Sequence, residues 1–236
     1  MNKYDKLKLR LLFVDALRQA KRSMPYRELA GETGISESVL ARYVTGSMVP
    51  GYETAAKLFS RVVKLVDPSR EIMVKAMESG GLLDLTPVLT NPFMLKMASL
   101  YFYDRFRAHN ITKILVPETS GITLATAISL EFGVEMVVAR RVKENPLIEY
   151  LEEHSIEPPS FTRVFYIPRN SITKWDRILI VDDIVQTGLT LSVMEKLAIK
   201  NSAKVIGVAA LVVVGEEWRK KVRTQRIEAL LKISKI

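Results

Sequence analysis

The segment most informative about the larger part of the chain reads Ile178-Leu179-Ile180-Val181-Asp182-Asp183-Ile184-Val185-Gln186-Thr187-Gly188-Leu189-Thr190. Its four leading apolar residues predict a buried strand, and two neighbouring aspartates stand where that strand is expected to end. A Thr-Gly-x-Thr turn then opens a helix predicted over residues 189–200. The turn brings backbone N–H groups, two hydroxyl groups and a helix N-terminus to one place, and this arrangement binds a phosphate group.

The two aspartates beside the turn have a separate role, because carboxylates repel a phosphate. Asp182 and Asp183 suit hydroxyl donors, such as the 2′ and 3′ hydroxyls of a ribose, or a hydrated Mg²⁺ ion held indirectly. Gly188 lets the backbone approach a ligand closely. We therefore expect the loop to hold a ribose 5-phosphate by both ends. The expected contacts are Asp182, Asp183, Val185, Gln186, Thr187, Gly188, Leu189 and Thr190.

The sequence around this loop alternates helical patterns with short apolar runs from residue 82 onward. Strands are predicted over residues 112–116, 134–139, 162–167, 177–181 and 204–214, and helices over 93–107, 122–132 and 189–200. This order predicts an α/β domain over residues 82–236, with a mainly parallel sheet flanked by helices. Ligands of such sheets bind beyond the carboxyl ends of the strands.

The segment 178–190 resembles the signature that binds 5-phosphoribosyl 1-pyrophosphate (PRPP) in type I phosphoribosyltransferases. The shared pattern is four apolar residues, two acids and Thr-Gly-x-Thr. The resemblance spans roughly residues 82–215 and implies that PRPP is bound together with Mg²⁺.

Two further segments resemble the pyrophosphate contacts of the same family. Residues 117–122 resemble its pyrophosphate loop, although an ordinary strand-to-helix turn has the same pattern. The resemblance makes residues 143–160 the mobile catalytic loop, and a solvated run of charges is the alternative. The pyrophosphate contacts expected from both segments are Thr119, Ser120, Gly121, Arg140, Arg141 and Lys143.

The base-binding part of the site is less well defined by the sequence. Trp218 follows the last predicted strand and could stack on a purine, or equally belong to the core or to a dimer interface. Members that act on 6-oxopurines carry an aspartate just before Thr-Gly, where this chain has Gln186. Glutamine cannot exchange a proton near neutral pH, so Gln186 argues against a 6-oxopurine substrate without excluding activity.

The first 66 residues have a different pattern. Helices are predicted over residues 6–22, 26–33, 36–45 and 52–66, and a connecting segment over 67–81 contains a helical stretch at 71–78. Gly34 and Ile35 join the second and third helices as in a helix-turn-helix of the Cro and lambda-repressor type. That resemblance predicts a set of DNA contacts: Arg27, Ser36, Glu37, Ser38, Arg42, Thr45 and Ser47. A four-helix oligomerisation module is the alternative.

Charge and composition narrow the possible functions. The 236 residues carry a net charge of +9, with twelve basic and six acidic residues in positions 1–66. This excess suggests a polyanionic partner, and a solvated cationic surface is the alternative, which charge alone does not exclude. The chain has no cysteine and only two histidines, which argues against disulfides and thiolate or multi-histidine metal sites. It has no apolar segment of the roughly 18 residues that a membrane span needs and begins with polar residues, so we expect a cytoplasmic protein.

Together these features resemble purine and pyrimidine regulators in which a helix-turn-helix domain is joined to a phosphoribosyltransferase domain. Archaeal orotate-phosphoribosyltransferase-like regulators and purine repressors built like xanthine phosphoribosyltransferase belong to this group. The first hypothesis is therefore a homodimeric regulator that binds double-stranded DNA and senses PRPP or a nucleotide. The second is an active purine phosphoribosyltransferase, and a third is a nucleic-acid-binding enzyme that regulates its own transcript. The basic tail, residues 219–235, is expected to be an interface helix or a second DNA contact.

Overall fold

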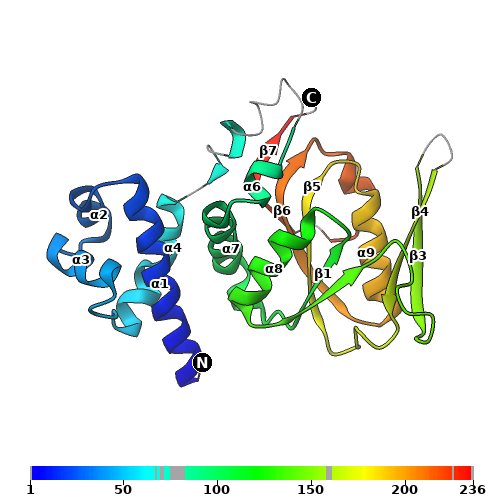
Figure 1. Ribbon diagram of the computed structural model, residues 1–236, viewed down its shortest axis with the longest axis horizontal. Coiled ribbons are helices and arrows are strands. Elements are labelled where there is room, and N and C mark those ends of the chain that lie inside the picture. The colour runs from blue at the N-terminus through cyan, green and yellow to red at the C-terminus, as the bar shows by residue number, and fades with distance from the viewer. Residues whose placement is uncertain are drawn as a thin grey trace.

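The computed structural model describes residues 2–66, 68–69, 72–74, 83–157, 161–224 and 226–234. Four helices form an N-terminal region that lies beside an α/β domain (Figure 1). The expected helix over 71–78 falls mostly outside the described residues, of which 72–74 are helical. Within the described part of the chain, no helix has both the length and the apolar character needed to span a bilayer.

The N-terminal region follows the sequence prediction closely. Its helices are α1 (Lys3–Ser23), α2 (Tyr26–Thr33), α3 (Glu37–Thr45) and α4 (Tyr52–Leu65). Asn2 caps α1 by accepting a hydrogen bond from the amide of Asp5 at 2.8 Å. Gly34 ends α2 in the left-handed conformation, which a residue with a Cβ adopts only at a cost, and so turns the chain into α3.

The α/β domain has a five-stranded parallel sheet in the order β2-β1-β5-β6-β7. The strands of the domain are β1 (Lys113–Pro117), β2 (Glu135–Ala139), β3 (Tyr150–Glu157), β4 (Phe161–Pro168), β5 (Arg177–Val185), β6 (Lys204–Val214) and β7 (Ile227–Ile233). Its helices are α6 (Thr86–Leu89), α7 (Pro92–Phe106), α8 (Gly121–Phe132) and α9 (Leu189–Lys200), with short 3-10 turns η1 (Arg107–His109) and η2 (Glu217–Lys220).

Each face of the sheet packs into its own core, because successive side chains of a strand point to opposite faces. Ile114 and Val116 of β1 belong to the core that contains residues of α7 and α8. Leu115 lies between them in sequence but belongs to the core formed with α9. Figure 1 shows α7 and α8 on one side of the sheet and α9 on the other. The expected α/β architecture with a mainly parallel sheet is therefore confirmed.

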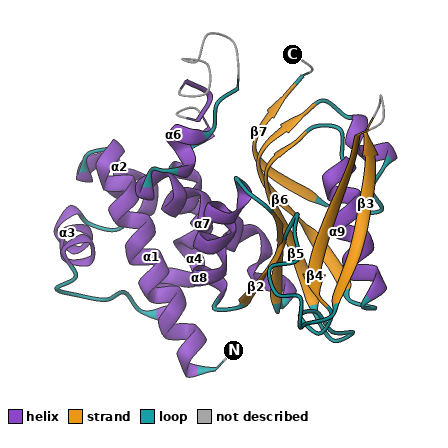
Figure 2. Ribbon diagram, turned by 45° about the vertical axis from the view of Figure 1, so that its right-hand side comes forward, coloured by secondary structure: helices purple, strands orange, loops and turns teal. Residues whose placement is uncertain are grey.

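The stretch 143–160 is not simply a loop, and the segment 162–167 is not a strand of the parallel sheet. β3 and β4 form an antiparallel hairpin, which lies alongside α9 (Figure 2). Glu153 of β3 is buried against α9, where Lys200 contacts it at 2.7 Å and Lys196 at 3.6 Å. Since β3 is mostly polar, its extended form depends on β4 and α9 rather than on an apolar pattern of its own.

The basic C-terminal tail was expected to be an interface helix or a second DNA contact, and the helix is wrong for its second half. Residues 227–233 form β7, which pairs with β6 at the edge of the sheet. Ile227, Ala229 and Leu230 are buried there. A short apolar run of this kind fits a buried strand as well as a helix, and the free edge of β6 decides between them.

The N-terminal region packs directly on the α/β domain. Residues of α1 and α4 share a continuous hydrophobic core with α7 and α8. Phe59 of α4 meets the edge of the Tyr103 ring of α7, with ring centres 6.0 Å apart. Lys96 of α7 contacts Asp15 of α1 at 2.9 Å and Glu131 of α8 at 2.7 Å. Apolar and charged contacts thus join the two parts.

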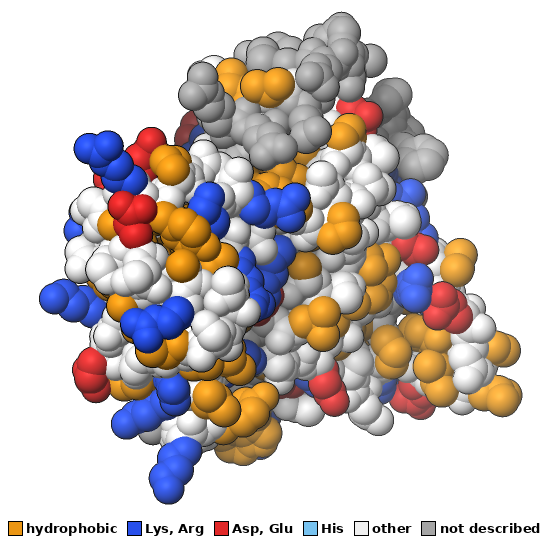
Figure 3. Space-filling model, turned by 60° about the vertical axis from the view of Figure 1, so that its left-hand side comes forward, with side chains coloured by type: hydrophobic (Ala, Val, Ile, Leu, Met, Phe, Trp, Pro, Cys, Tyr) orange, Lys and Arg blue, Asp and Glu red, His pale blue; other side chains and the backbone are white. Residues whose placement is uncertain are grey.

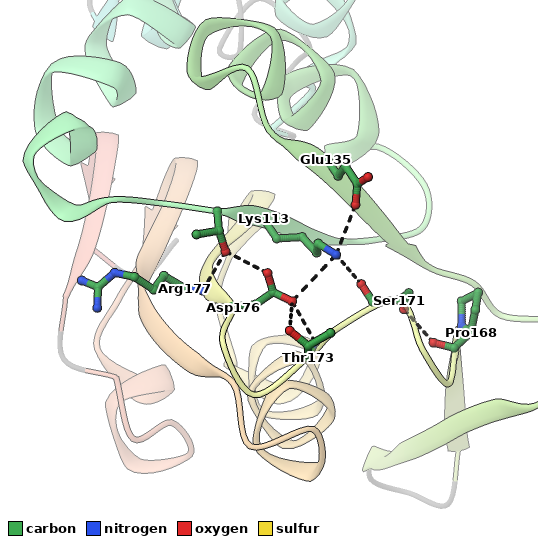
Figure 4. A network of polar contacts seen from close by, with 8 residues as sticks. Lys113, Glu135, Pro168, Ser171, Thr173, Asp176 and Arg177 are labelled. Atoms are coloured by element: carbon green, nitrogen blue, oxygen red, sulfur yellow. Dashed lines mark hydrogen bonds and ion pairs between the residues drawn. The ribbon is translucent and has the colours of Figure 1, made fainter. Parts of the chain in front are cut away.

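A polar network holds the end of the sheet opposite to the carboxyl ends of the strands (Figure 4). Asp176 accepts hydrogen bonds from the hydroxyl of Thr112 at 2.9 Å and the amide of Thr173 at 2.8 Å. Lys113 donates to the carbonyl of Ser171 at 2.7 Å and contacts Glu135 at 3.2 Å. These contacts tie the segment between β4 and β5 to the starts of β1 and β2.

Candidate functional site

The phosphate-binding loop forms where β5 passes into α9. β5 extends through Asp182 to Val185 because β6 continues to pair with it, so the strand is longer than its apolar run. Gly188, with a φ of 74°, turns the chain into α9. The loop lines an open cavity of about 400 Å³ at the helix N-terminus. Its walls are Arg163, Asp182, Ile184, Val185, Gln186, Thr187, Gly188, Leu189, Thr190 and Leu191.

A second cavity, of about 180 Å³, adjoins the first at the end of β1. It is lined by Pro117, Glu118, Thr119, Ser120, Arg141, Arg163, Phe165, Asp182, Asp183, Ile184 and Thr190. The peptide bond between Glu118 and Thr119 is cis. Gly121 lies behind this wall, where a Cβ would stand 3.3 Å from the Cα of Asp182, so α8 packs closely on β5.

The two cavities meet at the aspartates. Asp182, Ile184, Thr190 and Arg163 line both of them, whereas Asp183 lines only the second. The structure therefore brings the predicted phosphate loop together with Thr119 and Ser120 of the predicted pyrophosphate loop. This juxtaposition requires β1 and β5 to be neighbours in the sheet.

The basic residues after β2 are divided by the structure. Arg140 forms ion pairs with Glu118 at 3.7 Å and Glu144 at 3.4 Å. Lys143 pairs with Glu152 at 3.3 Å. Neither belongs to the wall of the second cavity, whereas Arg141 does.

Six residues that line the cavities were not among the predicted contacts, and Arg163 is the cation among them; the others are Pro117, Glu118, Phe165, Ile184 and Leu191. Arg163 lies on β4, far from the signature in sequence, yet it lines both cavities. Its signal is the alternation Arg163-x-Phe165-x-Ile167, in which Phe165 and Ile167 are buried. That pattern places Arg163 on the inward-facing side of the hairpin.

Burial and repulsion shape the electrostatics of the aspartate pair. Burial, together with the neighbouring charge of Asp183, raises the pKa of Asp182 well above its ordinary value. The amide of Asp183 donates to an Asp182 carboxylate oxygen at 3.0 Å and partly opposes this shift. A cation or hydroxyl donors of a ligand would favour the ionised form of Asp182.

The aspartate pair suits a Mg²⁺ ion carried by a phosphorylated ligand rather than one held by the protein alone. Mg²⁺ commonly takes one or two carboxylates and completes its shell with water and substrate phosphates. Among the described residues, no group of three or more acidic, histidine or cysteine side chains is arranged to hold a metal. The indirect role of Asp182 and Asp183 towards Mg²⁺ stays a prediction.

Trp218 lies in the core, which is one of the roles that the sequence leaves open. It is 3% exposed, and its indole N–H donates to the carbonyl of Gly215 at 3.2 Å. Gly188 of the phosphate loop packs against it, and a Cβ on Gly188 would stand 2.8 Å from the Cα of Trp218. Trp218 therefore supports the loop from behind.

All the residues predicted to contact DNA are exposed, and they gather on α2, α3 and the turns next to α3. The set comprises Arg27, Ser36, Glu37, Ser38, Arg42, Thr45 and Ser47. Ser36 precedes α3 at its N-cap position, but its hydroxyl lies 3.3 Å from that of Ser38 and caps no backbone N–H. At the other end of α3, the hydroxyls of Thr45 and Ser47 are 3.1 Å apart.

Comparisons with known proteins agree with this geometry. The family described as "Phosphoribosyl transferase domain" matches residues 86–233. A xanthine phosphoribosyltransferase of Bacillus cereus is 30% identical over 168 residues, which cover 67% of this chain and 84% of that protein.

The solved structures of two adenine phosphoribosyltransferases are also similar. The one from Thermoanaerobacter pseudethanolicus has a TM-score of 0.62 at 23% identity and covers 70% of this chain and 99% of its own. The one from Rhodothermus marinus has a TM-score of 0.58 at 26% identity and covers 63% and 85%. The matched region contains both cavities and the aspartate pair, and the chain belongs to the phosphoribosyl transferase domain family.

Proposed function

We propose that the chain is a purine phosphoribosyltransferase that binds PRPP with Mg²⁺ in the two adjoining cavities. The observation that carries the proposal is that two adjoining cavities, of about 400 and 180 Å³, meet at an aspartate pair. The 5′-phosphate occupies the cavity at the N-terminus of α9, and the pyrophosphate occupies the cavity beside Thr119 and Ser120. The ribose hydroxyls then lie against Asp182 and Asp183.

The proposed reaction is a group transfer at C1′ of the ribose. The bond from C1′ to the pyrophosphate oxygen breaks, a bond from C1′ to a ring nitrogen of the base forms, and the base loses a proton. The negative charges of Asp182 and Asp183 would stabilise positive charge that develops on the ribose. Mg²⁺ bound with PRPP would neutralise the leaving pyrophosphate. A purine is favoured because the similar proteins are named for xanthine and adenine.

Nucleotide synthesis from single bases tests this proposal. The protein is incubated with PRPP, Mg²⁺ and one of adenine, xanthine, hypoxanthine or guanine, and nucleotide and pyrophosphate are measured by chromatography. We expect one purine to be converted by the wild type, with the rate reduced at least 100-fold in the D182N/D183N double variant. R169Q is a suitable control, because Arg169 is exposed and pairs with Glu149 at 3.0 Å. If none of the bases gave product, the proposed transferase activity would be refuted.

DNA binding by the N-terminal region is a second candidate function. It is favoured by two consecutive helices, α2 and α3, that are joined by a short turn at Gly34 and present the exposed residues described above. Basic side chains are spread over this part of the molecule (Figure 3). Arg42 is in the last turn of α3 and could contact a guanine through two hydrogen bonds. A bound PRPP or nucleotide would then act as the effector of a regulator.

Fluorescence anisotropy with the DNA upstream of the protein's own coding sequence tests this candidate. We expect R42A to weaken specific binding about 5- to 150-fold, since a bidentate base contact contributes about 1–3 kcal/mol. R169Q should leave the affinity unchanged. Titrations with and without PRPP test the effector, which must bind the DNA-competent and incompetent states differently. If the wild type bound this DNA and an unrelated duplex with equal affinity, sequence-specific regulation through this DNA would be excluded.

A homodimer is proposed together with DNA binding, because dimers match paired half-sites on DNA. Sedimentation equilibrium of the full chain should then give twice the 26.7 kDa mass of one chain. A mass of one chain at micromolar concentration would contradict this expectation.

A further inference from the structure

Arg163 stands at a particular place in the β3–β4 hairpin. On β4, Phe165 and Ile167 are buried in the core on the α9 side of the sheet, whereas Val164 and Tyr166 between them are only half-buried. Arg163 comes two residues before Phe165 and lies on the same inward-facing side. Their Cα atoms are therefore about 6–7 Å apart along the strand. The inward side of β4 therefore passes from the apolar core to a cation at the level of the aspartate pair.

The position of Arg163 differs from that of the other cations near the site. Arg141 lines only the cavity beside Thr119 and Ser120, whereas Arg163 lines that cavity and also the one at the N-terminus of α9. Arg140 and Lys143 line neither cavity. Among the residues that line the two cavities, Arg163 is therefore the arginine that belongs to both walls.

We infer that Arg163 binds the 5′-phosphate and the pyrophosphate of PRPP together and so selects ligands that carry both groups. The inference rests on the proposed binding of PRPP and assigns the hairpin a direct part in it. A guanidinium is suited to this role, because its planar fork of N–H donors can serve two phosphate groups at once. The partly buried position strengthens each of these contacts relative to a fully exposed one.

Isothermal titration calorimetry with three probes tests the inference: PRPP with Mg²⁺, pyrophosphate with Mg²⁺, and ribose 5-phosphate. The proteins compared are the wild type, R163Q, R163K, R141Q and the exposed control R169Q. We expect R163Q to weaken PRPP binding at least tenfold and to weaken both pyrophosphate and ribose 5-phosphate. R141Q should weaken pyrophosphate and PRPP but leave ribose 5-phosphate within twofold. R163K should regain part of the loss, and R169Q should match the wild type.

The melting temperatures without ligand separate binding from folding. R163Q should melt within a few degrees of the wild type, and R163K provides a second variant if it does not. If R163Q bound PRPP with an affinity within twofold of the wild type, the inference would be overturned. The proposed transferase function would not be affected by that result. A loss confined to one of the two simpler probes would overturn the bridging role. Failure of the wild type to bind PRPP would overturn both the inference and the proposed function.

Discussion

Asp182 lies half-buried where the two cavities meet. Its pKa is raised in the folded protein by burial and by the charge of Asp183. A raised carboxyl pKa means that ionisation costs folding free energy, so this residue's contribution is most favourable at acid pH. It becomes less favourable as the pH rises from the unfolded pKa, about 4, through the raised folded value.

We therefore predict that D182N is more stable than the wild type near neutral pH while it binds PRPP more weakly. The expected gain in unfolding free energy is of the order of 0.5–2 kcal/mol, as is common where function opposes stability. Urea denaturation at pH 7.5 and at pH 4 measures it, and the gain should shrink at the lower pH. A D182N protein that is less stable than the wild type at pH 7.5 would contradict this prediction.

Gly188 and Gly215 provide a matched pair of glycines with positive φ, at 74° and 60°. An alanine in the left-handed conformation costs about 1–2 kcal/mol. At Gly215 nothing stands within 4 Å of a new Cβ, whereas at Gly188 the backbone of Trp218 would be 2.8 Å away. We expect G215A to lose about 1–2 kcal/mol in chemical denaturation, and G188A to lose about 1–3 kcal/mol more through overpacking. Equal losses would show that the contact with Trp218 is relieved easily.

At the scale of elements, α9 supports both the phosphate loop and the segment that follows η2. Glu195 of α9 is 4% exposed and accepts hydrogen bonds from the amides of Arg223 at 2.8 Å and Thr224 at 2.7 Å. These bonds hold the chain between Trp218 and β7. One acidic side chain thus anchors the connection that leads β6 to its edge partner.

We predict that E195Q lowers the unfolding free energy by about 1–3 kcal/mol, because each backbone N–H bonds a different oxygen of Glu195 and glutamine replaces one of these oxygens with an NH2 donor. Chemical denaturation measures the loss. E149Q is the control, since Glu149 is exposed and a surface ion pair contributes about 0–1 kcal/mol. If both variants lost the same amount, the anchoring role of Glu195 would be wrong.

At the scale of the whole molecule, the N-terminal helices and the α/β domain share one hydrophobic core. Separate domains on a flexible tether would unfold independently, whereas a shared core couples them. We therefore expect one cooperative transition in calorimetry, with equal calorimetric and van't Hoff enthalpies. Two resolved transitions would show that the junction contributes little.

Lys96 is the charged centre of that junction. Burial alone would lower its pKa, but the hydrogen bonds and charges of Asp15 and Glu131 outweigh burial and raise it. A raised lysine pKa means that this stabilisation is complete below the unfolded pKa, about 10.4, and is lost as the pH rises through the folded value.

We predict that K96M loses about 1–3 kcal/mol of unfolding free energy at pH 8. This loss is smaller than that expected for a fully buried ion pair, because the Lys96 side chain is 29% exposed. The difference from the wild type should narrow above pH 10.5 in urea denaturation. R61M is the control, because Arg61 is exposed and pairs with Glu32 at 3.2 Å within the N-terminal region. A pH-independent difference would mean that packing, not charge, is lost.

Features that depend on neighbours along the chain were predictable from the amino-acid sequence. The phosphate loop is a strand, a turn and a helix start within residues 178–190, and all of its predicted contacts come together in the structure. The N-terminal helices were also predicted within a few residues, because their apolar periodicity and their glycine stops are local signals.

The other features depend on partners far away in the sequence, so they follow only from the three-dimensional fold. The polar strand β3 is held by β4 and α9, and β7 is a strand because β6 offers it a free edge. Arg163 joins the site because the β3–β4 hairpin, which packs alongside α9, brings it to the walls of both cavities. Short apolar and polar runs have no unique conformation alone. They form a strand only when a part of the chain that is distant in sequence packs against them.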